Sequence, residues 1–121
     1  MERTAGSDPL DQSTLENLER NVGAEVMTVL VAEFLSDVDG RLSRLAAAAQ
    51  AGNLQATLAE SHDLGTESGS LGLSQLFAAA RRIETAARGG DATAVQDEVA
   101  QIAAWSVPGI QALRSRFPDA V

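Results

Sequence analysis

Apolar residues recur at intervals of three and four through most of this chain, which is the spacing of one face of an α-helix. The longest segment of this kind runs from about Ala24 to Gln50 and ends at the stop signal Ala51-Gly52-Asn53. Its apolar positions are Met27, Leu30, Val31, Phe34, Val38, Leu42, Leu45 and Ala49. No segment alternates apolar and polar residues with period two, so the pattern predicts helices and no strands.

A short helix is predicted before this segment. It follows a leader, residues 1–9, which we expect to be disordered because it has no periodic pattern. Asp11 or Ser13 is placed to cap the short helix, and Leu15 and Leu18 give it one apolar edge. The residues from 21 to 23 end it.

Three further helices are predicted after residue 53. The first begins near Leu54, and its inward stripe is Leu54, Leu58, Ser61, Leu64, Ser68 and Leu71, with Glu60, Asp63 and Glu67 on a solvated flank. The second runs from about Leu73 to Arg88 and buries Leu76, Ala79, Ala80, Ile83 and Ala87. The third is capped by Asp91, and its stripe is Val95, Val99, Ile102, Ile110, Leu113 and Phe117. We expect Pro108-Gly109 to kink or interrupt this last helix.

Four long amphipathic segments joined by short glycine-containing turns predict an all-α fold. The expected architecture is an antiparallel up-down-up-down four-helix bundle over residues 10–118, with the short N-terminal helix capping one end. A chain of 121 residues is long enough for one core and too short for two. Because it has only three Phe and one Trp, that core must be aliphatic and alanine-rich, which favours closely packed helices.

The composition narrows the range of partners. There are 17 acidic and nine basic residues, a formal net charge of −8, so we expect neither nucleic acid nor a membrane as a partner. All nine basic residues are Arg, and there is no Cys, which excludes thiolate metal sites and thiol nucleophiles. No apolar run approaches the roughly 18 residues of a membrane span, and the N-terminus lacks a signal-peptide pattern, so we expect a cytoplasmic protein.

His62 is the single histidine, and its neighbours on the predicted helix are small. At about 100° per residue, six residues share its face and form a predicted docking surface: Gln55, Leu58, Ala59, Gly65, Thr66 and Gly69. Glycine destabilises a helix interior by up to about 1 kcal/mol relative to alanine, so the presence of Gly65 and Gly69 inside a helix calls for an explanation. Close approach by another molecule is the reason that we expect.

The chemistry open to His62 is limited. A zinc site lacks a second His or any Cys, and Asp63 points about 100° away around the helix, which argues against a Ser-His-Asp triad. A lone, accessible imidazole can still accept and donate a group near pH 7 as a nucleophile. The alternative is a solvated surface histidine on a bundle of other purpose.

From about Leu10 to Phe117 the chain resembles the histidine phosphotransfer (HPt) domains of multi-step two-component phosphorelays. The family pattern His-x-Leu-Lys-Gly-x-Ser-x-x-x-Gly is matched by His62-Asp63-Leu64-Gly65-Thr66-Glu67-Ser68-Gly69-Ser70-Leu71-Gly72, followed by Leu76 and Arg82-Ile83-Glu84. The resemblance implies that His62 is phosphorylated and that the partners are a hybrid sensor histidine kinase and a response regulator receiver domain. It implies a phosphocarrier, not an enzyme with turnover of its own, with no bound cofactor and with Mg²⁺ on the partner. We expect a monomer.

The sequence departs from the family pattern at two positions: Gly65 stands where the family has Lys, and Thr66 where it has Gly. In the family that Lys is thought to balance the phosphoryl charge. Residues that match Glu84 and Arg88 face the histidine in family members, so Glu84 is expected to orient the imidazole and Arg88 to reach the phosphoryl oxygens. Arg81 lies on the same flank of its helix. The alternative for Glu84 and Arg88 is an exposed i,i+4 pair worth about 0.2–0.5 kcal/mol.

Three functions therefore stand side by side. The first is a phosphocarrier that works through His62. The second is a degenerate HPt-like adaptor that binds receiver domains without phosphotransfer, as the missing Lys would allow. The third is a helical interaction module in which His62 is incidental.

Overall fold

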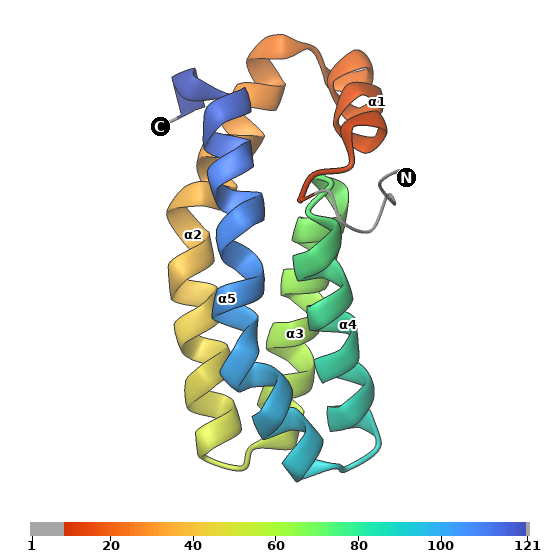
Figure 1. Cartoon of the computed structure of the whole chain (residues 1–121), viewed down its shortest axis with the longest axis vertical. Helices are drawn as coiled ribbons and strands as arrows, with labels where there is room; N and C mark the ends of the chain where they lie inside the picture. The colour runs from red at the N-terminus through yellow and green to blue at the C-terminus, as the bar shows by residue number, and fades with distance from the viewer. Residues whose placement is uncertain (1–8, 121) are drawn as a thin grey trace, which may run out of the picture.

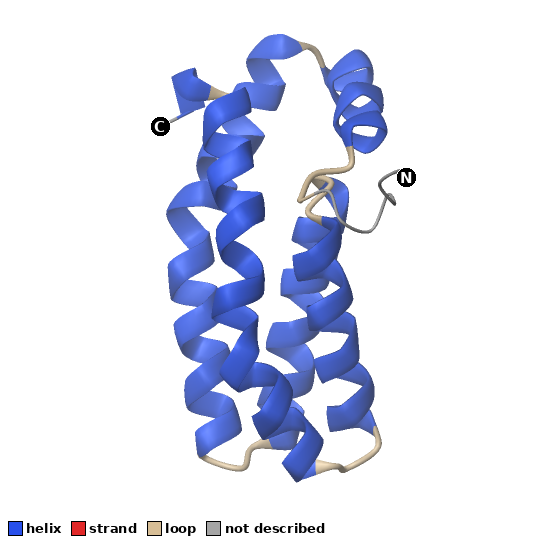
Figure 2. Ribbon diagram, viewed as in Figure 1, coloured by secondary structure: helices blue, strands red, loops and turns tan. Residues whose placement is uncertain are grey.

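The computed structural model describes residues 9–120, which form five α-helices and one short 3₁₀ helix and contain no strand (Figure 2). The elements are α1 (Gln12–Val22), α2 (Ala24–Gln50), α3 (Leu54–Ser70), α4 (Ser74–Arg88), α5 (Ala92–Arg116) and η2 (Pro118–Ala120). The predicted all-α class is confirmed. The predicted disordered leader lies outside the described residues except for Pro9.

The four long helices lie side by side along the long axis of the molecule (Figure 1). α3 packs against α2 and α4, and α5 packs against the same two helices, so the apolar stripes of all four meet around one core. α1 lies at one end, in contact with α2 and α3. The fully buried side chains include Leu15, Met27, Leu45, Leu64, Leu73, Leu76, Ile83 and Leu113. Burying each of these large aliphatic side chains contributes about 1.5–3 kcal/mol.

Three acidic or amide side chains begin helices as N-caps. Asp11 accepts hydrogen bonds from the backbone N–H groups of Ser13 and Thr14, so it, and not Ser13, caps α1. Asn53 caps α3 and Asp91 caps α5 in the same way. These bonds satisfy N–H groups that have no partner within the helix, and each cap contributes about 1 kcal/mol.

The turn between α3 and α4 also holds the start of α1. Gly72 has φ +75°, a conformation that favours glycine, and its carbonyl accepts a hydrogen bond of 2.7 Å from the backbone N–H of Asp11. A Cβ atom on Gly72 would lie 2.8 Å from the carbonyl oxygen of Asp11. This close contact fixes where α1 joins the bundle, which places α1 beside the C-terminal end of α3.

α5 continues through Pro108-Gly109, so the predicted interruption does not occur. Proline removes a single N–H donor, and the helix is buried on both sides of Pro108, at Ser106 and Gly109. Gly109 is buried, and a Cβ atom there would lie 2.6 Å from Cδ2 of Leu73. The glycine makes room for Leu73 and does not end the helix.

Candidate functional site

His62 lies on α3, where its imidazole contacts a carboxylate of α4. Nδ1 of His62 is 3.0 Å from Oε2 of Glu84, and the histidine side chain remains 54% exposed. Glu84 is buried, with 3% of its surface exposed. The expected contact between Glu84 and the imidazole is therefore present, and it joins an accessible ring to a fixed acceptor.

The Glu84 carboxylate receives two further donors from its own helix. Nη1 of Arg81 donates to Oε1 at 2.9 Å, and Nη2 of Arg88 donates to Oε2 at 3.0 Å. Residues 81, 84 and 88 are neighbours on one face of a helix because they are three and four positions apart. The i,i+4 pair between Glu84 and Arg88 thus exists together with the histidine contact, because the carboxylate has enough acceptor sites for both.

Burial of Glu84 raises its pKa, but the hydrogen bonds from His62, Arg88 and Arg81 outweigh this effect and hold the pKa below its ordinary value of 4.5. Glu84 is therefore ionised near neutral pH. A carboxylate only accepts hydrogen bonds, so the contact assigns the ring proton to Nδ1. The lone pair of the neutral imidazole is then on Nε2, which makes Nε2 the nucleophilic atom.

Glu84 reaches His62 because α3 is narrow on the side that faces α4. Gly65 is buried, and a Cβ atom on it would be 3.5 Å from Cβ of Ala80. A Cβ atom on Gly69 would be only 2.8 Å from Cδ1 of Phe77. At both positions the element that approaches the glycine is α4, which gives these glycines a structural reason besides the approach of an outside molecule.

The remaining residues of the predicted docking surface are accessible to different extents. Gln55, Ala59 and Thr66 are exposed, whereas Leu58 and Gly69 are half-buried. The Thr66 hydroxyl donates to the carbonyl oxygen of His62 at 3.1 Å, so it is held within one turn of the imidazole. A molecule that approached His62 along α3 would meet these five residues.

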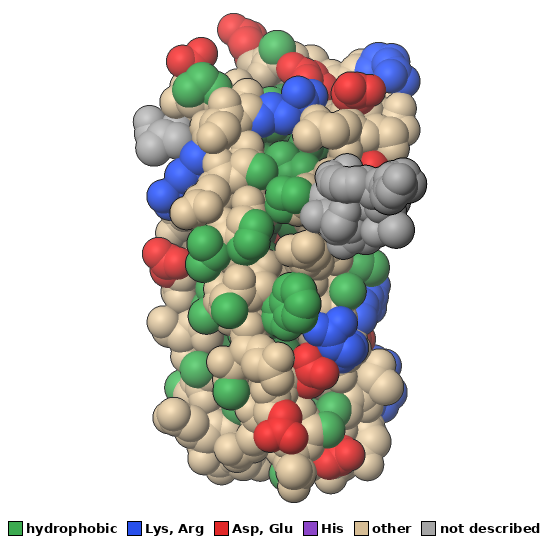
Figure 3. All heavy atoms as spheres, viewed as in Figure 1, with side chains coloured by type: hydrophobic (Ala, Val, Ile, Leu, Met, Phe, Trp, Pro, Cys, Tyr) green, Lys and Arg blue, Asp and Glu red, His purple; other side chains and the backbone are tan. Residues whose placement is uncertain are grey.

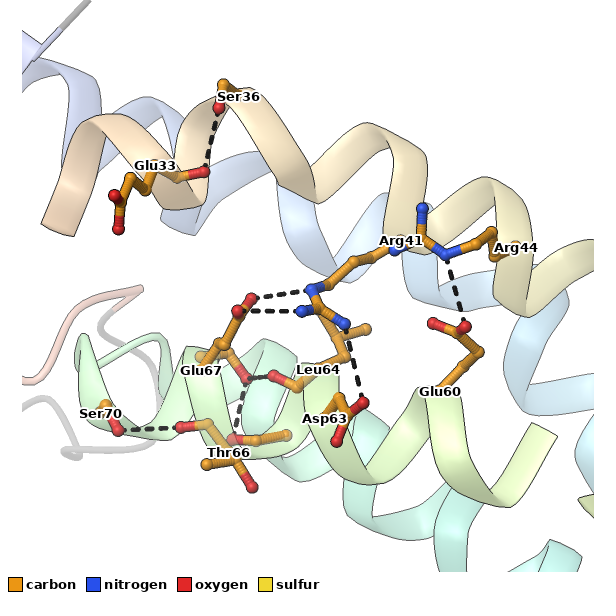
Figure 4. A network of polar contacts seen from close by, with 12 residues as sticks. Glu33, Ser36, Arg41, Arg44, Glu60, Asp63, Leu64, Thr66, Glu67 and Ser70 are labelled. Atoms are coloured by element: carbon orange, nitrogen blue, oxygen red, sulfur yellow. Dashed lines mark hydrogen bonds and ion pairs between the residues drawn. The ribbon is translucent and has the colours of Figure 1, made fainter. Parts of the chain in front are cut away.

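A second charged group borders His62 on the side of α2. The Arg41 side chain, 19% exposed, crosses to α3, where its Nε lies 2.9 Å from Oε1 of Glu67 and its Nη1 lies 3.9 Å from Oδ2 of Asp63 (Figure 4). These three residues line an open hollow of about 410 Å³ together with His62 and Thr66. Our sequence analysis did not identify Arg41 and placed the acidic residues on a solvated flank.

The acidic flank of α3 is partly covered because α2 presents arginines to it. Besides the Arg41 contacts, Nε of Arg44 lies 3.3 Å from Oε2 of Glu60, whose side chain is 25% exposed. Asp63 is the most exposed of the three acidic residues on this flank. Opposite charges on facing helices thus align α2 with α3 beside the site.

Other kinds of site find little support in residues 9–120. No group of three or more His, Cys, Asp and Glu side chains in that range is placed to hold a metal ion. None of the helices described is long and apolar enough to cross a bilayer. On the face shown in Figure 3, basic side chains lie in small separate groups among acidic and apolar ones.

Comparison with known proteins finds one family match and one similar structure. The family model of the Hpt domain matches residues 29–115 of this chain. The crystal structure of histidine-containing phosphotransfer protein B (HptB) from Pseudomonas aeruginosa PAO1 is similar to this one, with a TM-score of 0.86 and 24% sequence identity, over 93% of this chain and 97% of that one. At that identity the likeness concerns the fold. A comparison with curated proteins finds no match.

Proposed function

Because the chain belongs to the Hpt domain family, we propose that His62 accepts a phosphoryl group from the receiver-domain aspartate of a hybrid sensor histidine kinase and passes it to the aspartate of a response regulator. The observation that carries this assignment is the 3.0 Å contact between Nδ1 of His62 and the buried carboxylate of Glu84. It leaves Nε2 as the nucleophile on an imidazole that is more than half exposed.

In the forward step the lone pair of Nε2 attacks the phosphorus of the partner's aspartyl phosphate. The Nε2–P bond forms, the bond from phosphorus to the aspartate oxygen breaks, and its electron pair stays on the aspartate carboxylate. The Nδ1 proton remains in place, so the ring becomes positively charged while it carries the phosphoryl group. The ionised Glu84 carboxylate faces that new charge, and transfer to the response regulator reverses each change.

Orientation and charge are divided between the two proteins. Glu84 fixes the ring, and Arg81 and Arg88 fix Glu84, so this domain supplies a positioned nucleophile. Mg²⁺ on the receiver domain would neutralise charge on the phosphoryl oxygens during transfer. This chain then acts as a phosphocarrier without turnover of its own.

The docking of the receiver domain is proposed to use the exposed part of the α3 face. Gln55, Ala59 and Thr66 surround the imidazole, with Leu58 and Gly69 half-buried beside them. The connections between the four long helices are three residues each, which favours the antiparallel up-down-up-down order. A monomeric, cytoplasmic protein that binds neither nucleic acid nor membrane fits the net charge of −8 and this family.

The test is incubation with a receiver domain that carries labelled aspartyl phosphate. We expect acid-labile, alkali-stable label on the wild-type protein and none on His62→Gln. The His62→Gln variant should keep its melting temperature nearly unchanged, because the imidazole is 54% exposed and not part of the core. Alkali-stable label on His62→Gln would refute the assignment of the site.

The adaptor function remains a second candidate because Gly65 replaces the lysine that the family resemblance leads us to expect at this position. An adaptor would bind the receiver domain with measurable affinity and acquire no label. Calorimetric titration of the same receiver domain, run beside the labelling experiment, separates the two functions.

A further inference from the structure

A phosphoryl group on His62 brings two negative charges to a surface whose cations are already paired. Among residues 9–120, three arginines border His62 or the carboxylate that it contacts: Arg41 on the side of α2, and Arg81 and Arg88 on the side of α4. Arg41 is 19% exposed and lies between two carboxylates, those of Asp63 and Glu67. On the α4 side, two arginines share the single carboxylate of Glu84, so the surplus positive charge is there.

The two arginines on α4 hold different oxygens of that carboxylate. Arg88 donates to Oε2, the same oxygen that contacts Nδ1 of His62, so its bond helps to fix the oxygen that orients the ring. Arg81 donates to Oε1, which does not contact the ring. Arg81 can therefore leave Glu84 without releasing the imidazole.

The path of the Arg81 side chain also leads toward the histidine. Its guanidinium group stacks on the ring of Phe77, 5.1 Å from the centroid, and its Nε and Cδ lie 3.9 and 4.0 Å from where a Cβ atom of Gly65 would be. Gly65 is one turn beyond His62 on α3, a spacing that separates neighbouring side-chain origins by about 5–6 Å. Arg81 thus crosses from α4 over the backbone at Gly65, one turn from His62 on α3.

Arg81 is also open to a ligand. Its side chain is 46% exposed, and it lines a hollow of about 530 Å³ whose wall includes Gly65, Thr66 and Gly69. Only the arginine end of this pair is exposed, because the Glu84 side chain is 4% exposed. The buried carboxylate nevertheless stays paired when Arg81 leaves, since Oε2 keeps the bond from Arg88 and the contact with His62. A phosphoryl dianion is the stronger acceptor of a planar, two-pronged guanidinium group.

We propose that Arg81 is the phosphoryl-binding cation of this domain, that it moves from Glu84 to the phosphoryl group when His62 is modified, and that Gly65 is the opening through which it does so. Arg88 stays on Glu84 as a positioning residue. This inference rests on the proposed phosphocarrier function. It places the phosphoryl-binding cation on α4, whereas the lysine of the family pattern would stand on α3.

The first test compares Arg81→Gln with Arg82→Gln. Arg82 is the next residue on the same helix and is equally exposed at 46%, but it pairs with Glu98 on the other flank. We expect Arg81→Gln to lower the equilibrium uptake of phosphoryl from a phosphorylated receiver domain by about threefold to tenfold, and Arg82→Gln to leave it unchanged. Equal uptake by the two variants would overturn the inference.

A second measurement distinguishes contact with the phosphoryl group from an indirect effect. A nearby cation favours the dianion, so it lowers the pKa of the phosphoryl group, which ³¹P NMR follows on the protein phosphorylated with phosphoramidate. Arg81→Gln should raise that pKa, whereas Arg88→Gln should slow phosphorylation and leave the pKa in place. A shift with Arg88→Gln and none with Arg81→Gln would assign the role to Arg88.

The role of Gly65 is tested by side-chain size. The methyl group of Gly65→Ala fits at ordinary contact distance, whereas the longer side chain of Gly65→Leu must occupy the path of Arg81. We expect Gly65→Leu to lower phosphoryl uptake as much as Arg81→Gln does, and Gly65→Ala to lower it less. The double variant that combines Gly65→Leu with Arg81→Gln should show no further loss. Additive losses in the double variant would refute the link between Gly65 and Arg81.

Absence of label on the wild-type protein would overturn the phosphocarrier function and this inference together. A labelled wild type with an unaffected Arg81→Gln variant would overturn the inference alone.

Discussion

Replacing Glu84 by glutamine tests the centre of the site, because it keeps the shape of the side chain and removes its charge. The Nδ1–H of His62 can still donate to the amide oxygen, but the ring that becomes positive during phosphoryl transfer no longer faces an anion. Two unit charges 3.0 Å apart attract each other by about 1.4 kcal/mol at the dielectric constant of water, and by about 5.5 kcal/mol at an effective value of 20.

The exposure of the imidazole decides between these limits. Because 54% of the histidine side chain is exposed while Glu84 is buried, the interaction belongs near the lower limit, at about 1.5–3 kcal/mol. Glu84→Gln should therefore slow phosphoryl acceptance by roughly tenfold to a hundredfold. The assay is a time course with a phosphorylated receiver domain. Glu98→Gln is the control, because Glu98 pairs with an arginine at the same 3.0 Å but on the opposite flank of α4. Wild-type rates with Glu84→Gln would refute the reasoning.

The same variant has a signature in the pH dependence of stability. The folded-state pKa of Glu84 lies below 4.5, so the folded protein binds fewer protons than the unfolded chain between these two values. This contribution to stability is complete above about pH 4.5 and is lost as the pH falls through the folded-state pKa. Chemical denaturation from pH 7 to pH 3 should show a steeper loss of unfolding free energy for the wild type than for Glu84→Gln. Parallel curves would contradict the pKa assignment.

Two further predictions concern pairs of matched variants. Gly65→Ala should raise the free energy of unfolding by up to about 1 kcal/mol, because its methyl group fits and alanine favours the helix, whereas Gly69→Ala should lower it, because Phe77 must move from a 2.8 Å contact. Denaturant titration measures the free energy of unfolding of both variants, and a change in the same direction for both would contradict the packing explanation. Arg88→Ala should slow phosphoryl transfer severalfold, because Oε2 of Glu84 loses a donor, and Arg114→Ala on α5 should not. Equal time courses for these two alanine variants would remove Arg88 from the site.

The helices could be predicted from the sequence because their signals are local. The apolar period and the stop signal at residues 51–53 define α2 to the residue, and the capping side chains of Asp11 and Asp91 mark where α1 and α5 begin. Of the kink or interruption expected at Pro108-Gly109, the interruption is wrong, because tertiary contacts decide what a buried glycine does. Gly109 has no side chain, which leaves room for Leu73, and the period of apolar residues does not reveal this contact.

The pairing of the site residues could be anticipated from distances along the chain. His62 and Glu84 are each eleven residues from Leu73 in the turn between α3 and α4, so they stand at the same level when the chain reverses there. The same rule places Arg41 opposite Asp63, because each is eleven residues from Gly52. The equal spacing of Arg41 and Asp63 from Gly52 is therefore the sequence signal that could have identified Arg41 as a neighbour of the site.

The purpose of the small residues on α3 could not be read from their positions on a helical wheel. A wheel shows which residues share a face with His62, but it does not show how far the neighbouring helix extends over that face. Gly65 lies close enough to the edge of α4 that Ala80 and Arg81 cover it. The two glycines differ in their consequences: Gly69 lets α4 approach, because a Cβ atom there would lie 2.8 Å from Phe77, whereas Gly65 leaves space for the Arg81 side chain one turn from His62. A lysine at position 65 would place a cation in the same space from α3. If Arg81 binds the phosphoryl group, as we propose, a glycine at 65 is compatible with phosphoryl chemistry as long as Arg81 is present.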